Sequence, residues 1–83
     1  MEPKIVGNRI KELMKIKQIK EIDLAKELNI PMEELKKKLN GEEEFFVSQI
    51  MQIKEIFHLN LNTWAGLFFE EDFNLEEIFA NLY

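Results

Sequence analysis

Apolar residues recur at intervals of three and four along the first part of the chain. Between Lys4 and Lys17 this spacing places them on one face of an α-helix, while Lys and Arg occupy much of the other face. The inward positions are Val6, Ile10, Leu13 and Met14. The pattern predicts an amphipathic helix over Lys4–Lys17 that is broken at Gln18-Ile19-Lys20.

Two shorter helices are predicted next, joined by a tight turn. The first covers Glu21–Leu28 and the second covers Met32–Leu39. Asn29-Ile30-Pro31 separates them, because proline disfavours helical geometry at the residue before it and suits a helix start. Asn40-Gly41 closes the second helix, since glycine adopts the left-handed conformation at a helix end. The inward residues are Leu24, Ala25, Leu28, Leu35 and Leu39.

The second half of the chain predicts two or three further helices. Residues 42–44 are three glutamates and are expected to form a solvated loop. Ser48 is a candidate cap for a helix with Ile50, Ile53, Ile56 and Phe57 inward. Either Asn60 or Asn62 caps the next, which runs through Trp64 and Leu67 to Phe69. Asn74-Leu75-Glu76-Glu77 has the pattern of a capping box, and it begins a last helix with Ile78, Phe79 and Leu82.

No segment shows sustained alternation of apolar and polar residues, so no strand is predicted. The 83 residues, of which 46% are apolar, suffice for one small folded domain. We therefore expect an all-α fold of five or six helices. Residues 1–69 would form a helix-turn-helix domain, and residues 70–83 would form a helical extension that belongs to the same core or makes a dimer contact.

Composition excludes several kinds of chemistry. The chain has no cysteine and a single histidine, His58, which excludes disulfides, thiol chemistry and two-histidine metal sites. No combination of nucleophile, base and orienting group is recognisable, so we expect no enzymatic activity, metal or cofactor. No apolar run approaches the roughly 20 residues needed to cross a bilayer, and the first residues lack a secretory signal. A cytoplasmic domain is the resulting expectation.

Charge and aromatic residues divide the chain in two. Residues 1–41 carry ten Lys/Arg against seven Asp/Glu, whereas residues 42–83 carry Lys54 against nine carboxylates. All nine aromatic residues lie at position 45 or later. The basic half is a candidate surface for a polyanion, and its lack of aromatics argues against base stacking with single strands. The net charge of −5 argues against strong non-specific binding to nucleic acid. Two differently charged faces of one core would give the same pattern.

The stretch from 21 to 39 has the form of a helix, a tight turn and a second helix that projects outward. It resembles the Cro/repressor-type helix-turn-helix proteins, the XRE family of phage and bacterial regulators. Ile10-Lys11-Glu12-Leu13-Met14 is similar to the first helix of that family. Asp23-Leu24-Ala25-Lys26-Glu27-Leu28-Asn29-Ile30 is similar to its second helix and turn, and Leu35 with Leu39-Asn40-Gly41 is similar to its recognition helix and exit. The resemblance covers about residues 4–69 and implies a lambda-repressor-like fold that binds DNA.

The chain departs from this family at positions that bear on DNA binding. The family usually has Ser or Thr and then Gln at the start of its second helix, where this chain has Lys20 and Glu21. The recognition helix opens with Pro31-Met32-Glu33-Glu34 rather than with a hydroxyl residue and polar residues. Members often carry an Arg–Glu pair between the first helix and the end of the third, where Met14 and Leu39 stand here. A carboxylate at a helix start suits the helix dipole but repels a phosphate.

The resemblance and the helix geometry select the candidate DNA contacts. With Leu35 and Leu39 inward, Glu33 and Lys37 point most directly outward. Lys37 would reach guanine or phosphate, and Glu33 would accept a bond from a cytosine amino group. Pairing of Glu33 with Lys37 and of Glu34 with Lys38 along the helix explains the same residues without DNA. The candidate DNA-binding residues are Arg9, Lys20, Glu21, Met32, Glu33, Lys36, Lys37 and Lys38.

Six aromatic residues crowd the last twenty positions, more than a small core readily buries. This apolar end either folds back on its own core or forms a contact with a second copy or another protein. The candidate contact residues are Phe73, Ile78, Phe79, Leu82 and Tyr83. Two hypotheses result. The chain is a homodimeric regulator of double-stranded DNA of phage or mobile-element type, or it is a protein-interaction module on a helix-turn-helix scaffold with weak or lost DNA binding.

Overall fold

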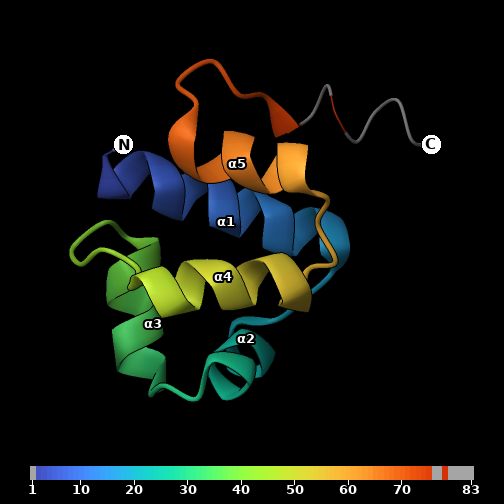
Figure 1. Ribbon diagram of the computed structural model, residues 1–83. Helices are drawn as coiled ribbons and strands as arrows, with labels where there is room; N and C mark the ends of the chain where they lie inside the picture. Colours follow the sequence, from blue (N-terminus) through green and yellow to red (C-terminus); the bar gives the residue numbers. More distant parts are fainter. Residues whose placement is uncertain (1, 76–77, 79–83) are drawn as a thin grey trace.

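The computed structural model describes residues 2–75 and residue 78, and they form a bundle of helices (Figure 1). No strand occurs within this described part of the chain, which confirms the all-α expectation. The helices are α1 (Pro3–Lys17), α2 (Glu21–Leu28), α3 (Met32–Leu39), α4 (Val47–Ile56) and α5 (Leu61–Phe69). The predicted last helix falls mostly on residues outside the description.

The ends of α1 and α2 follow the sequence closely. Each helix ends on a residue in the left-handed conformation, Gln18 with φ of 58° and Asn29 with φ of 56°. The amide of Ile30 donates back to the carbonyl of Ala25, which closes α2. Only three residues then separate α2 from α3, so the two helices form the predicted helix-turn-helix unit. Gly41, with φ of 79°, takes the predicted left-handed conformation after α3.

One of the two predicted caps, that of α5, is confirmed, and the other, that of α4, is wrong. Asn60 caps α5, because its Oδ1 accepts the amide of Thr63 at 2.8 Å. The prediction that Ser48 caps α4 is wrong, since the N-cap is Phe46 and the helix begins at Val47, which places Ser48 inside the first turn. There the side chain of Gln49 reaches back, and its Oε1 accepts the amide of Phe46 at 2.9 Å. An amide side chain inside the first turn replaces the hydroxyl that the sequence suggested.

The core lies between two groups of helices. In Figure 1, α1 and α5 lie together on one side of α4, and α2 and α3 lie on its other side. Met14 and Leu39 are both buried, so an apolar pair occupies the positions at which the family that the sequence resembles often has an ion pair. The fully buried centre, with at most 1% of each side chain exposed, includes Ile10, Leu13, Leu24, Leu35, Leu39, Ile53, Phe57 and Leu67.

Residues beyond α5 join this core rather than a separate unit. Leu75 is buried, and the Phe73 ring lies against Gly66 of α5 at a distance that leaves no room for a side chain at position 66. Gly7 of α1 has a similar role, because a Cβ there would clash with the backbone carbonyl of Leu39. This close approach brings α1 directly onto the end of α3.

Candidate nucleic-acid interface

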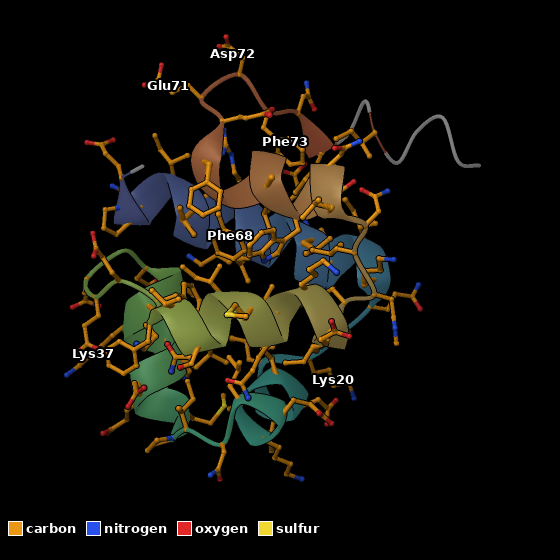
Figure 2. All side chains as sticks on the ribbon, viewed as in Figure 1. Lys20, Lys37, Phe68, Glu71, Asp72 and Phe73 are labelled. Atoms are coloured by element: carbon orange, nitrogen blue, oxygen red, sulfur yellow. The ribbon has the colours of Figure 1, made fainter. Side chains whose placement is uncertain are left out.

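The outward face of α3 carries part of the predicted DNA-binding set. Glu33, Lys36 and Lys37 are exposed, and Met32 is half-buried. Figure 2 shows the Lys37 side chain extending away from the bundle at the outer side of α3. Leu35 and Leu39 are buried on the opposite face, as the helical spacing predicts. The side chain of Lys37 is therefore available to a ligand outside the bundle.

The start of α2 contributes two more exposed residues, Lys20 and Glu21. Glu21 and Lys36 line one shallow surface hollow together with Lys11 and Asn40, so α1, α2 and α3 meet there. The Lys11 Nζ donates to the Asn40 Oδ1 at 2.9 Å. In Figure 2, Lys20 and Lys37 lie on opposite sides of the view. The hollow thus joins Glu21 to Lys36 as part of one surface.

The Lys38 side chain does not face outward, contrary to the prediction. Only 1% of it is exposed, and its Nζ donates to the Glu44 carbonyl at 3.0 Å. The same ammonium lies 3.8 Å from the centroid of the Phe46 ring and 3.7 Å from a carboxylate oxygen of Glu34. The loop after α3 folds over this flank of the helix, which a helical projection of α3 alone does not include. Lys38 is therefore a structural residue that holds the loop.

Arg9 is also turned inward, and its predicted contact with DNA is a second correction. Its guanidinium donates to the carbonyls of Gly66 and Leu67 at 3.3 and 3.1 Å and to that of Glu71 at 2.8 Å. It also lies 5.5 Å from the centroid of the Phe73 ring. A cation at the C-terminal end of a helix is favoured by the helix dipole, so Arg9 stabilises the end of α5.

Both corrections reduce the positive charge available to a polyanion. With Arg9 and Lys38 turned inward, eight lysines and seven carboxylates remain in residues 1–41. The first turns of α2 and α3 carry only acidic charges, at Glu21, Asp23, Glu33 and Glu34. Glu34 is held by Lys38 and lies 3.5 Å from the Gln49 side-chain nitrogen. The basic charge for a DNA ligand therefore sits at the C-terminal end of α3 rather than at its start.

The predicted partner contacts at the end of the chain divide into two groups. Phe73 and Ile78 are partly buried and pack against the core of their own chain, which accounts for their apolar character without a partner. Phe79, Leu82 and Tyr83 lie outside the described residues. A different apolar surface, not predicted from the sequence, consists of the exposed residues Phe46, Val47, Met51 and Phe69. The signal was the run of three apolar residues at 45–47, directly after three glutamates.

Other kinds of site find little support in the described part of the chain. No three side chains there group in a way that would hold a metal ion. None of its helices combines the length and the apolar character needed to cross a membrane. Comparison with protein-family models, with curated proteins and with solved structures finds no match for this chain.

Proposed function

We propose that this chain binds duplex DNA as a non-enzymatic transcriptional regulator of the XRE type that its sequence resembles. The observation that carries the proposal is the projection of Glu33, Lys36 and Lys37 from α3 while α2 packs behind it. A helix presented in this way fits the major groove, which is about 12 Å wide in B-DNA. The lambda-repressor-like fold and the phage or mobile-element setting belong to the same proposal.

Each exposed residue has a defined role in this proposal. Lys37 donates to the O6 and N7 acceptors of a guanine or to a phosphate, and Glu33 accepts from the amino group of a cytosine. Lys36 and Lys20 bind phosphates and position the domain on the duplex. The carboxylate of Glu21 disfavours a phosphate at the start of α2. Positioning therefore depends on lysine side chains rather than on the helix terminus.

A homodimer on two half-sites is part of the same proposal, because paired half-sites about one helical turn apart need two recognition helices. Phe79, Leu82 and Tyr83 are the candidate contact between the two copies, since Phe73 and Ile78 pack within their own chain.

Substitution of Lys37 by alanine tests the DNA contact. If Lys37 reads a base, Lys37→Ala weakens binding to the preferred site by about 1–3 kcal/mol and relaxes the preference at one base position. Selection from a pool of random duplexes, followed by anisotropy titration of the selected site, measures both effects. Lys54→Ala is the control, because it removes one positive charge from α4, a helix that carries none of the residues assigned to the interface. Equal loss of affinity in the two variants contradicts a specific role for Lys37.

A second candidate function is a protein-interaction module that retains the helix-turn-helix scaffold. It is favoured by the inward position of Arg9 and Lys38 and by the carboxylates at the first turns of α2 and α3. These features lower the affinity for a polyanion without lowering the stability of the helices, since acidic residues at a helix start are favourable. The absence of any duplex binding at low salt would select this candidate.

A further inference from the structure

An apolar groove opens on a different part of the molecule from the outward face of α3. Its apolar lining is formed by Val6 of α1, Phe45 of the loop before α4, Ile50 of α4, and Phe68 and Phe69 of α5. Figure 2 shows Phe68 between the layer of α1 and α5 and the neighbouring helix α4. The hollow measures about 160 Å³. That is close to the ~150 Å³ of an apolar cavity that holds benzene, and well below the ~300–1,000 Å³ of small-molecule sites. It therefore has room for one large apolar side chain.

The surface beside the groove is apolar as well. Phe46, Val47 and Met51 are 63%, 74% and 61% exposed, and Phe69 at the edge of the groove is 65% exposed. Val47 and Met51 are four residues apart on α4, so they share one face of that helix. Contiguous exposed apolar surface of this kind marks a site of interaction with another macromolecule. A helix laid along α4 would cover this face and could direct one side chain into the groove.

The charge around the groove selects the kind of partner. Glu43 and Glu44 form part of its wall, Glu42 precedes them, and all three are exposed. Such a rim repels the phosphates of nucleic acids and of anionic lipids. A second copy of the chain would bring the same acidic rim if it docked face to face, so complementarity favours a partner with Lys or Arg.

We infer that this groove is the docking site for a cationic amphipathic helix of another protein. The helix places one large apolar side chain between Phe45, Ile50 and Phe68, covers Val47 and Met51, and sets Lys or Arg opposite Glu43 and Glu44. The inference does not depend on DNA binding, because it uses none of the residues assigned to that interface.

Three synthetic helical peptides without tryptophan provide the probe. One carries leucines on one face and lysines on the flanks, the second replaces the lysines by glutamates, and the third is a scrambled form of the first. Trp64 is the only tryptophan of the chain. Its Nε1 donates to the Ile50 carbonyl at 2.8 Å, and its ring meets the Phe69 ring edge-on at 5.9 Å between centroids. The fluorescence of Trp64 therefore reports on occupation of the groove in the full-length chain. The lysine peptide is expected to bind at least ~10-fold more tightly than either of the others. Like charges across the interface disfavour the glutamate peptide, and the scrambled peptide does not present its leucines on one face.

Matched variants locate the binding. The double variant Val47→Ser/Met51→Ser is expected to weaken binding of the lysine peptide ~10-fold or more through lost apolar contact. The double variant Glu43→Gln/Glu44→Gln is expected to reduce the ratio of the affinities for the lysine and glutamate peptides. Its affinity for the lysine peptide should also depend less on salt than that of the parent chain. The controls are Ile22→Ser, which removes a 51% exposed apolar residue from α2, and Glu27→Gln, which removes an exposed carboxylate from the same helix. Both controls should retain the affinity of the parent chain.

Four results would overturn the inference. The first is equal binding of the lysine, glutamate and scrambled peptides, and the second is binding of the Val47/Met51 variant with the affinity of the controls. The third is a dimer of the parent chain in light scattering that Met51→Ser dissociates, which would make a second copy the occupant of this face. The fourth is binding to vesicles of anionic phospholipid that is lost in the same variant, which would make a membrane the occupant. None of these results bears on Lys37 and duplex DNA, so the two proposals fail separately.

Discussion

Replacement of Arg9 by alanine tests how the end of the chain is held to the bundle. The Arg9 guanidinium joins α1 to the carbonyls of Gly66 and Leu67 in the last part of α5 and to that of Glu71 beyond it. Phe73 lies under the same cation. Arg9→Ala therefore removes the group that donates hydrogen bonds to carbonyls at the end of α5 and that fixes residues 70–75.

The structure gives the magnitude of the effect. The Gly66 carbonyl also accepts the amide of Glu70 at 3.2 Å, and Glu71 is exposed to water, so neither carbonyl is left without a partner. The Leu67 carbonyl at the helix end loses its donor, which costs about 1–3 kcal/mol for a buried acceptor. Loss of the contact with Phe73 adds about 1 kcal/mol, and loss of two buried methylene groups adds about 1.5 kcal/mol. Release of the guanidinium into water offsets part of this sum, so we expect a net loss of about 3 kcal/mol.

Urea denaturation, followed by far-UV circular dichroism and by Trp64 fluorescence, measures the loss. A domain of this length has a free energy of unfolding of about 4–12 kcal/mol, so the variant should stay folded but lose a large share of its stability. Arg9→Lys retains the charge and the stem but not the planar fork, and we expect it to lose about half as much. Lys15→Ala, at an exposed position of the same helix, is the control and should change stability by less than about 0.5 kcal/mol.

A loss below about 1 kcal/mol in Arg9→Ala would refute this account of the helix end. So would a loss that disappears at high salt, because the contacts of Arg9 are hydrogen bonds in a buried setting rather than exposed ion pairs.

Two further predictions concern the packing around α3. Lys38→Met keeps most of the buried volume and should change the free energy of unfolding by less than about 1.5 kcal/mol, whereas Lys38→Ala should cost about 2–4 kcal/mol, as measured by urea denaturation. Because Lys38 is buried, Lys38→Met should also leave duplex affinity unchanged in an anisotropy titration; a loss equal to that of Lys37→Ala contradicts the buried position. Gly7→Ala places a Cβ against the backbone of Leu39 and should lower the free energy of unfolding by more than about 2 kcal/mol, and a neutral result would show that α1 and α3 do not approach so closely.

The helices were predictable from sequence because each has a regular apolar face and a clear end. The boundaries of α2 and α3 agree with the prediction, and α1 begins only one residue earlier. The recurrence of apolar residues at intervals of three and four shows which side chains of a helix are buried. Pro31 and Gly41 are strong signals for the start and the end of α3. Ser48 misled because a hydroxyl before an apolar run is a common cap, yet Gln49 supplies the hydrogen bond here.

The candidate site was less predictable because burial depends on loops as well as on helix faces. Spacing correctly placed Glu33 and Lys37 on the outside of α3, but it also placed Lys38 on an open flank. The loop containing Glu44 and Phe46 covers that flank, and no periodicity within α3 encodes it. Arg9 was misplaced for a similar reason, since its partners are backbone carbonyls more than fifty residues away. Every residue has a backbone carbonyl, so the sequence does not show which carbonyls accept a hydrogen bond from Arg9.

Spacing placed Ile50, Ile53 and Ile56 inward and left Val47 and Met51 outside this set, but it does not show whether another element covers these two residues. Ile53 and Met51 are both apolar residues of one helix, yet Ile53 is fully buried and Met51 is 61% exposed. The positions of α2 and α5 decide which apolar residues of α4 receive a neighbour. Of the aromatic residues that crowd the end of the sequence, Phe73 is partly buried against the core, whereas Phe69 is 65% exposed.

The most direct test of the central claim is the salt dependence of duplex binding by the full-length chain. Anisotropy of a labelled pool of random duplexes, titrated at salt concentrations between about 50 and 200 mM, measures the logarithmic slope of affinity against salt. If Lys20, Lys36 and Lys37 each neutralise one phosphate, the slope is about −2.7 and affinity falls ~40-fold across this range. Binding with that slope, reduced by about one unit in Lys36→Ala, is the predicted result. No binding at the lowest salt, or binding that does not respond to salt, contradicts the claim that this chain is a DNA-binding regulator.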